Sequence, residues 1–448
     1  MGTTLITGAK IVRADGVSKG DIAIEDGTIT AVGPDLPRRG AEQIDADGLV
    51  AFPGVVDVHN HMHDPALFPE GIDFASQTAS AVAGGVTTVV ELPTQSPITT
   101  QASFESKVAD CDELAHIDFG LVAGNFEESE VDTDGLLAAG TPDFKTFTAD
   151  PYRASDRTII DLMEQVGAAG GTVRVHCETQ AILDHARGQI ESQRPEVYMD
   201  SRPIEAELDA INRVGNFAAY TDCPLHIVHI SSGTGAREAA RVDDRTEVPI
   251  TLETCPHYLA FSKEDVAELG PFLKVNPSLK SPTEVERLWE AVADGTIDLI
   301  ASEHFPTYRE NRERGWENIW EPYAGLPTIE TMLEFLVTEG VHAGRISWSR
   351  LRELLCERPA SEAGLEGTKG TIAEGADADL VLLREEDWTV TADELFYNGN
   401  WTPFEGREFS ASIETVIAGG EIAATDHEVH TEPGDGSFLP RGPVAGSE

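Results

Sequence analysis

The sequence is poor in positive charge, and in lysine above all. Only eight of its 448 residues are lysine, and Lys plus Arg total 32 against 79 Asp plus Glu, so the formal net charge is −47. So acidic a surface repels nucleic-acid phosphates and anionic membranes, and we expect neither as a partner. A hydrophobic content of 40% argues against disorder. Many carboxylates with little lysine indicate a halophilic protein, because a Debye length of about 3 Å at 1 M salt screens such charges from one another.

Three further features are missing. The five cysteines are irregularly spaced without a CxxC pair, which favours reduced thiols over a disulfide framework or a structural zinc ribbon. The N-terminus has no basic segment followed by an apolar core, and no apolar run approaches about 18 residues, so we expect a cytoplasmic protein without a signal peptide or membrane span. Neither GxGxxG nor GxxxxGK[ST] follows an early strand-like run, which gives little support to a dinucleotide or P-loop site.

What the sequence does contain, between residues 53 and 365, is an alternation of apolar strand-like runs with helix-like stretches. The eight runs are 55–59, 86–91, 118–123, 143–147, 172–176, 225–229, 248–252 and 297–301. Continuous apolar strands alternating with helices predict an α/β fold with a buried parallel sheet. Eight such units fit a (β/α)8 TIM-type barrel, and a doubly wound open sheet is the alternative.

The two ends of the chain are β-rich. Residues 1–52 and 366–423 read as short strands joined by turns, so we expect them to form one small β domain together. Residues 424–448 are acidic and rich in Gly and Pro, and they predict a C-terminal tail that is either extended over the surface or over a neighbouring subunit, or disordered.

The strongest chemical signal is a pair of histidines at the end of the first barrel strand. His59 and His61 are two residues apart and therefore share one face of a strand. Active sites of such barrels lie at the C-terminal ends of the strands, and two neutral imidazoles suit zinc or a similar divalent ion. Asp57 lies on the same face, and we expect it to be a supporting partner of this pair.

Other strand ends add matching residues. His176, His229 and Glu303 each follow an apolar run, whereas His226 has the opposite parity to His229 and is expected to face the helices. Lys145 lies between aromatic residues within a strand, where a buried cation is costly. One explanation is that its ammonium group reaches the end of the strand or pairs with a carboxylate. The other is that CO2 converts the amine to a carbamate, an anion that could bridge two metal ions about 3.5–4 Å apart.

Together these residues resemble the cyclic amidohydrolases: dihydroorotase, allantoinase, hydantoinase and dihydropyrimidinase. The motifs that carry the resemblance span nearly the whole chain and lie at residues 57–61, 83–88, 144–147, 175–178, 201–203, 229–232, 253–259, 274–277 and 377–380. The resemblance implies a distorted (β/α)8 barrel with a small β-sandwich domain built from both termini.

The resemblance also implies two divalent metal ions, zinc first, with manganese, cobalt or iron as alternatives. Their ligands would be His59, His61, Lys145 as a CO2-derived carbamate, His176, His229 and Glu303. A hydroxide that bridges the metals would hydrolyse a C–N bond in a cyclic amide, and Glu303 would be the catalytic carboxylate that transfers the proton to the leaving nitrogen.

The sequence departs from the family pattern at several positions, among them residues 63–66, where allantoinases would have Asn-Glu-Pro-Gly, and Thr307, where dihydroorotases carry a His. Glu303 stands where the family has Asp, which leaves open either an active hydrolase or a catalytically weakened or non-catalytic barrel. His63 stands where dihydroorotases place a substrate-binding Arg, which disfavours a dihydroorotase. Residues 253–259 are most similar to those of allantoinases. An allantoinase-like activity is therefore the first prediction, and a hydantoinase or dihydropyrimidinase is the second.

Four further residues are predicted to contact the substrate by their positions: His63, Tyr152, Asn276 and Gly325. The family resemblance also implies a homo-oligomer, either a dimer or a tetramer.

Overall fold

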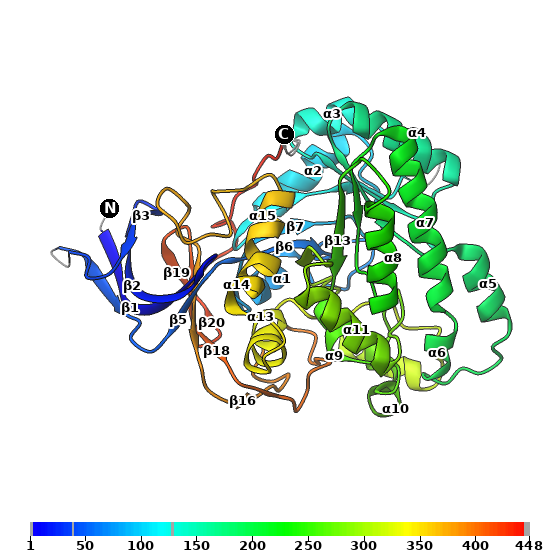
Figure 1. Cartoon of the computed structure of the whole chain (residues 1–448). Helices are drawn as coiled ribbons and strands as arrows, with labels where there is room; N and C mark the ends of the chain where they lie inside the picture. The colour runs from blue at the N-terminus through cyan, green and yellow to red at the C-terminus, as the bar shows by residue number, and fades with distance from the viewer. Residues whose placement is uncertain (1–2, 38–39, 127–129, 443–448) are drawn as a thin grey trace.

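A barrel of parallel strands and a smaller sheet domain make up the chain (Figure 1). The computed structural model describes residues 3–37, 40–126 and 130–442. The barrel strands are β6 (Val55–Asn60), β7 (Val86–Glu91), β8 (Asp118–Leu121), β9 (Ala123–Gly124), β10 (Asp143–Phe147), β11 (Thr172–His176), β12 (Leu225–Ile227), β13 (Ile250–Thr254) and β14 (Leu299–Ile300). This arrangement confirms the predicted α/β fold with a distorted barrel.

Helices follow the strands along the chain, and long ones such as α4, α7 and α8 cover the outside of the barrel (Figure 1). They are α1 (Phe74–Ala83), α2 (Gln101–Asp112), α3 (Thr133–Ala139), α4 (Asp156–Ala168), α5 (Gln180–Gly188), α6 (Val197–Asp200), α7 (Ile204–Thr221), α8 (Gly233–Asp243), α9 (Pro256–Ala260), α10 (Val266–Leu269), α11 (Pro282–Ala293), α12 (Arg309–Glu313), α13 (Met332–Leu336), α14 (Trp348–Arg352) and α15 (Arg358–Glu362). None of the described helices is both long and apolar enough to cross a membrane.

The barrel is split into two parallel sheets, in the orders β6-β7-β8 and β9-β10-β11-β12-β13-β14. Backbone hydrogen bonds close it where the ends of β14 and β6 meet. The N–H of Glu303 donates to the carbonyl oxygen of His59 at 2.7 Å, and the N–H of His61 donates to that of His304 at 2.8 Å. This closure rules out the doubly wound alternative, and it brings the C-terminal ends of the first and last strands together at one mouth of the barrel.

The predicted strands lie close to the observed ones, but four of them differ. The predicted strand 225–229 ends two residues earlier, at Ile227, and the predicted strand 297–301 is reduced to Leu299–Ile300. The predicted third strand is divided at Val122 into β8 and β9. The predicted seventh strand starts two residues later, at Ile250, directly after Pro249. A proline has no N–H to donate to a neighbouring strand, so the ladder starts after it.

The smaller domain joins both ends of the chain, as predicted. Its strands run in the order β20-β19-β18-β15-β5-β1-β2-β3, with β4 beside β1. Their bounds are β1 (Thr3–Arg13), β2 (Gly16–Glu25), β3 (Thr28–Gly33), β4 (Glu42–Asp45), β5 (Val50–Pro53), β15 (Leu380–Arg384), β18 (Ser412–Ala418), β19 (Glu421–Thr425) and β20 (Glu428–Val429). The two chain ends meet where Phe52 of β5 pairs with Val381 of β15. Ile6, Ile22 and Leu380 belong to one buried apolar cluster, which ties both ends into a single core.

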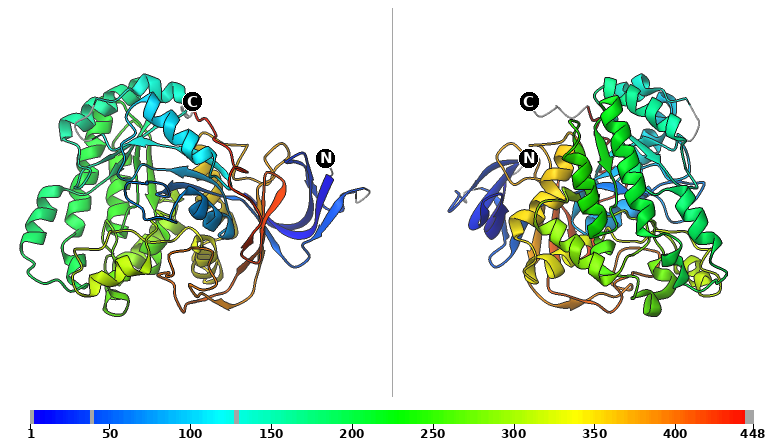
Figure 2. Two further views of the ribbon diagram at one scale, coloured as in Figure 1. Left: turned by 180° about the vertical axis from the view of Figure 1, so that it is seen from behind. Right: turned by 45° about the vertical axis from the view of Figure 1, so that its right-hand side comes forward.

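The C-terminal tail leaves β20 and runs back along the barrel (Figure 2). The ring of Phe438 lies 5.7 Å from that of Phe119 in β8. The buried guanidinium of Arg441 forms an ion pair with Asp143 of β10. The predicted boundary of the tail, residue 424, is wrong, because it falls inside β19 and the first tail residues belong to the sheet. Apolar packing and a buried ion pair fasten the rest of the described tail to the barrel, and residues 443–448 lie outside the described part of the chain.

Candidate functional site

A cavity of about 390 Å³ opens at the C-terminal ends of the barrel strands. Nine of the ten predicted site residues line it: His59, His61, Lys145, Tyr152, His176, His229, Asn276, Glu303 and Gly325. These residues are separated by up to 266 positions in the sequence (59 to 325), and the closure of the barrel brings them to one place. The remaining wall includes Leu67, Pro93, Thr94, Gln95, Phe147, Arg202, Phe305 and Tyr323.

The four predicted histidines face one another across the cavity. The ring centroid of His59 lies 5.6 Å from that of His61 and 5.5 Å from that of His229. Nδ1 of His176 lies 2.9 Å from Nε2 of His229. Burial lowers the pKa of all four rings. They are therefore neutral at pH 7, which is the form of imidazole that binds metal ions.

Glu253, a residue to which the sequence assigned no role, contacts His59 directly. Its Oε1 lies 2.6 Å from Nδ1 of His59 and accepts a hydrogen bond from the backbone N–H of His229 at 2.9 Å. His226 lies between two carboxylates, with Nε2 3.0 Å from Oε2 of Glu253 and Nδ1 3.0 Å from Oε1 of Glu362. Because Nδ1 of His59 donates to Glu253, Nε2 is the atom of this ring left for a ligand.

The expected position of His226 is therefore wrong: it is in register with Arg174 and Lys145 and points into the polar interior of the barrel, where it meets Glu253 and the end of α15. The reason is local backbone geometry. β12 ends at Ile227, and His229 has a left-handed φ of +43°. The two-residue alternation of a strand does not continue through such a residue, so counting back from His229 gives the wrong face.

Lys145 is fully buried in β10. Its Nζ lies 5.0 Å from the ring centroid of Phe147 and has neither a hydrogen bond nor an ion pair within the described part of the chain. Burial lowers the pKa of this amine to about 8. A substantial fraction is therefore neutral near pH 7 to 8, and the neutral amine is the form that reacts with CO2.

Glu303 lies three residues beyond the end of β14 and has a left-handed φ of +46°, which is uncommon outside glycine. Asp57 fixes the residue before it, because its carboxylate accepts hydrogen bonds from the N–H of Ser302 at 2.8 Å and from its hydroxyl at 2.7 Å. Asp57 therefore supports the strand end that carries Glu303, and does not contact the ring of His59 or His61 as expected.

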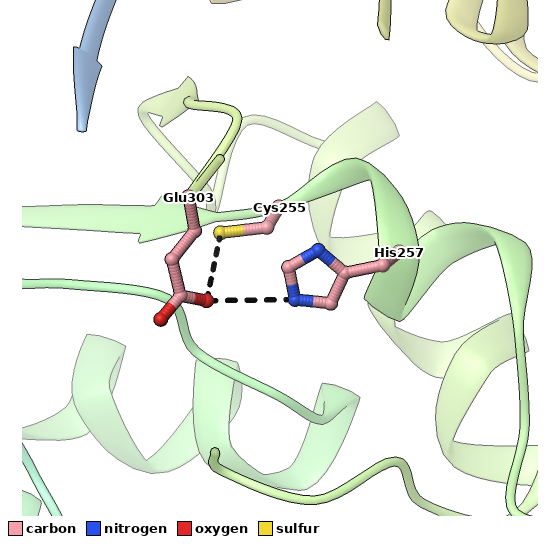
Figure 3. A group of neighbouring side chains, drawn as sticks. All are labelled: Cys255, His257 and Glu303. Carbon is pink, nitrogen blue, oxygen red and sulfur yellow. Dashed lines mark hydrogen bonds and ion pairs between the residues drawn. The ribbon is translucent and has the colours of Figure 1, made fainter. Parts of the chain in front are cut away.

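The carboxylate of Glu303 faces the side chains of Cys255 and His257 (Figure 3). Oε2 lies 3.5 Å from Nε2 of His257 and 4.0 Å from Sγ of Cys255. Burial raises the pKa of Glu303 well above its usual range, against the opposing charge of Lys145. Pro256 occupies the first turn of α9, where its fixed φ suits helix initiation, and it thereby places Cys255 and His257 on either side of the helix start.

Three of the four predicted substrate contacts lie in the cavity wall. The ring of Tyr152 is 5.4 Å from that of Phe147, and the amide oxygen of Asn276 accepts a hydrogen bond from the hydroxyl of Tyr198. Gly325 has a φ of +137°, and a Cβ at this position would lie 2.4 Å from that of Phe305. Only glycine fits there, so its backbone is open to the cavity.

His63, the fourth, does not line the cavity. Its ring packs against Phe74 with centroids 6.3 Å apart, and its N–H donates to Glu91 at 2.8 Å. Strand-like pairing ends at His61, whose N–H donates to the carbonyl oxygen of His304, whereas the N–H of His63 donates to a side chain, so the alternation that aligns His59 with His61 does not extend to His63. The predicted orientation of His63 toward the substrate is therefore not found.

Comparisons with known proteins agree with this architecture. The model of the "Amidohydrolase family" matches residues 50–423. The chain belongs to this family. It is 36% identical to an allantoinase of Rubrobacter xylanophilus, over 94% of this chain and 95% of the relative. It is 30% identical to an L-hydantoinase of Paenarthrobacter aurescens, over 98% of both chains.

Solved structures of amidohydrolase relatives confirm the fold. A dihydropyrimidinase from Brevibacillus agri superposes with a TM-score of 0.93 at 26% identity, over 99% of this chain and 100% of that one. An L-hydantoinase from Arthrobacter aurescens gives a TM-score of 0.92 at 30% identity, over 98% and 100%. The predicted family and its barrel with a β-sandwich are therefore confirmed.

The cavity of this amidohydrolase fits a metal centre. Nε2 of His59, Nδ1 of His229 and Nζ of Lys145 are buried atoms that have no hydrogen-bond partner among the described residues. Such atoms are rare in folded proteins unless an ion or a water satisfies them. Neutral imidazole nitrogens suit zinc and also manganese, cobalt or iron, so the donor set agrees with the metal chemistry that the sequence predicts.

A second supporting carboxylate, Glu178, was also missed by the sequence analysis. Its Oε2 lies 2.9 Å from Nε2 of His176, and both of its oxygens accept hydrogen bonds from Arg202, a residue of the cavity wall. The signal was present in the sequence, since Glu178 and Arg202 both lie in motifs of the family resemblance, but their pairing depends on the fold.

Proposed function

We propose that this amidohydrolase uses a binuclear metal centre to hydrolyse a C–N bond of a cyclic amide, with allantoin as the first candidate substrate. The observation that carries the proposal is the convergence of four neutral histidines, the unpaired Lys145 and the carboxylate Glu303 on one cavity. A barrel that served only as a scaffold would need none of these buried polar groups, which are costly without partners.

Each ligand residue has a role in holding the ions. The proposed ligands are His59, His61, Lys145, His176, His229 and Glu303. Nζ of Lys145 would add one CO2 and release one proton, and the resulting carbamate would be an anionic oxygen ligand for the ions. Glu253 would keep Nδ1 of His59 protonated and thereby direct Nε2 to the ion.

The ions, when bound, would polarise the substrate carbonyl and lower the pKa of a water toward neutrality. Glu303 would accept the proton of the attacking water on its carboxylate and return it to the leaving nitrogen. The hydroxyl of Tyr152 would stabilise negative charge on the carbonyl oxygen, and Asn276 and the backbone at Gly325 would bind the polar edge of the ring.

The relatives support allantoin first, because the allantoinase of Rubrobacter xylanophilus is 36% identical over nearly the whole chain. Hydantoins and dihydropyrimidines are the second candidates, supported by the L-hydantoinase at 30% identity and by the dihydropyrimidinase fold. Dihydroorotate is the third. His63 occupies the position of the carboxylate-binding Arg, and an imidazole cannot form the bidentate pair that Arg forms.

A non-catalytic barrel remains the alternative of another class, and the longer side chain of Glu303 is the feature that favours it. The test is elemental analysis of the purified protein, together with turnover of allantoin, hydantoin, dihydrouracil and dihydroorotate in molar KCl. We expect two metal ions per chain and hydrolysis of allantoin. A protein that contains no metal and turns over none of the four rings would refute the proposal.

The same proposal includes zinc as the metal, a halophilic and cytoplasmic setting, and a homo-oligomer. The net charge of −47 with only eight lysines supports the halophilic setting. Light scattering in molar KCl distinguishes a dimer or tetramer from a monomer.

A further inference from the structure

A row of charged and polar side chains runs through the barrel interior from the cavity to the opposite end of the strands. Nδ1 of His59 lies 2.6 Å from Oε1 of Glu253, whose Oε2 lies 3.0 Å from Nε2 of His226. Nδ1 of His226 lies in turn 3.0 Å from Oε1 of Glu362. These four residues form the interior row, and they come from β6, β13, β12 and α15.

The two ends of the interior row have different surroundings. His59 lines the cavity at the C-terminal ends of the strands. Glu362 instead lines a separate hollow of about 280 Å³, together with residues at the starts of β13 and β14. The side chain of Glu362 is 14% exposed, whereas those of His226 and Glu253 have no exposed surface. The row therefore connects the predicted metal centre to the base of the barrel.

The ring of His226 lies between two carboxylates. Burial lowers the pKa of His226, but the carboxylates of Glu362 and Glu253 outweigh this effect and raise the pKa above its usual value. A protonated ring is the form of imidazole that presents an N–H on both sides. A neutral ring would leave one of the carboxylates opposite a bare nitrogen, and an unpaired buried charge is costly. His226 is therefore a buried imidazolium that pairs with both carboxylates.

The other charged groups around His226 favour the same protonation state. Asp143 forms buried ion pairs with Arg174 and Arg441, and Arg174 is in register with His226. These two guanidiniums face three carboxylates, those of Asp143 and of the interior row, so a protonated His226 balances the remaining negative charge. Asp298, a further carboxylate near the ring, lies at the hollow of the barrel base, where solvent screens it.

We propose that His226 and Glu362 are positioning residues for the metal centre, and that they act on the ligand His59 through Glu253. This inference rests on the metal centre of the proposed function. Glu362 keeps His226 protonated, and the imidazolium keeps Glu253 ionised and in place. Glu253 accepts the hydrogen bond of His59 that directs Nε2 to an ion. A change of charge at the base of the barrel, outside the cavity, is therefore transmitted to the metal affinity.

The test is Glu362→Gln, which keeps the size of the side chain and removes its charge. Zinc affinity is measured by competition with a chromophoric chelator in molar KCl, from about pH 6 to about pH 9, and is divided by that of the wild type at each pH. The two proteins should have equal affinity at the acidic end, where both keep His226 protonated. As the pH rises, the variant loses this proton first, and its affinity should fall about 10-fold below that of the wild type, the lower end of the effect of an outer-shell partner.

This change with pH separates a positioning role from a loosened fold, which would lower the affinity at every pH. Thr251→Val is the matched control. The hydroxyl of Thr251 donates to Oε2 of Glu362 at 3.0 Å, so this substitution removes a hydrogen bond of the same carboxylate and leaves its charge. Its affinity should stay close to that of the wild type at every pH.

His226→Gln is the second variant, and it tests the interior row if Glu362→Gln does not fold. It removes the titrating ring, so its affinity should be about 10-fold below that of the wild type or lower, by a factor that does not change with pH. Thermal unfolding measured in parallel shows whether each variant is folded.

Wild-type affinity in folded Glu362→Gln or His226→Gln, a loss in Glu362→Gln that does not change with pH, or an equal loss in Thr251→Val overturns the proposal. Each of these results, in a wild-type protein that binds metal and hydrolyses a cyclic amide, leaves the proposed function intact and removes the positioning role alone. A wild-type protein that binds no metal refutes the proposed metal centre, and the positioning role with it.

Discussion

Glu253 gives the sharpest test of how this chain prepares a metal ligand. The substitution Glu253→Gln keeps the size of the side chain and removes its charge. Its carbonyl oxygen can still accept the two hydrogen bonds that now reach Oε1, from His59 Nδ1 at 2.6 Å and from the N–H of His229 at 2.9 Å. Its amide group then faces Nε2 of His226, which is 3.0 Å from Oε2 in the native protein.

The expected magnitude follows from this geometry. An outer-shell carboxylate that orients a ligating histidine is worth about 10–100-fold in metal affinity. That range corresponds to roughly 1.4–2.7 kcal/mol. Glu253 acts on His59 and at the same time holds the backbone at His229, so we expect a loss toward the upper end of the range for the first metal ion bound.

The assay is competition for zinc with a chromophoric chelator in molar KCl, with thermal unfolding measured in parallel. The matched control is Glu334→Gln, because Glu334 is equally buried but accepts its hydrogen bond from the N–H of Ile413, a residue outside the cavity. An affinity of Glu253→Gln equal to that of the wild type, in a protein that is folded, would refute the reasoning. So would an equal loss in the control.

Four other outcomes are expected. Lys145→Ala should lower both the metal content and the rate of hydrolysis. A short carboxylate such as acetate should restore part of the metal content and of the rate if a bridging anion is the missing group, and elemental analysis together with turnover measurements checks this. Glu303→Asp should lower the rate by about 100-fold, since a carboxylate misplaced by near 1 Å has an effect of that size; steady-state kinetics would contradict this if the rate rose. Arg441→Met should lower the free energy of unfolding by about 1–3 kcal/mol in a denaturant titration, because it removes one of the two buried arginines that pair with Asp143 and leaves only Arg174. Arg157→Met, at a position where the side chain is 86% exposed, should have little effect. Dialysis from molar KCl into dilute buffer should unfold the protein, as followed by circular dichroism, and a chain equally folded in both would contradict the halophilic interpretation.

The fold was predictable because the signals that specify it are local and repeated. Each barrel strand is a short apolar run bounded by polar residues, and eight such runs in alternation with helices leave few topologies. The histidine pair was placed correctly because residues two apart on a strand share a face, and His59 and His61 both line the cavity.

The same rule failed where the backbone left the strand. His63 is again two residues further, but backbone pairing stops at His61, and the ring of His63 packs against Phe74. His226 was assigned to the wrong face because His229 takes a left-handed conformation beyond the end of β12. Strand ends are where functional residues gather in this fold, and they are also where strand periodicity no longer holds.

The sequence by itself determined the class of fold, the family and the ligand types, because apolar periodicity, motif order and residue chemistry are all written along the chain. Only the tertiary structure decided which supporting groups touch those ligands. Glu253 lies 194 residues from His59, and Glu303 meets Cys255 and His257 only because β14 lies next to β13. Contacts of this kind arise from the closure of the barrel, which brings distant strand ends together, and no pattern within a single segment encodes them.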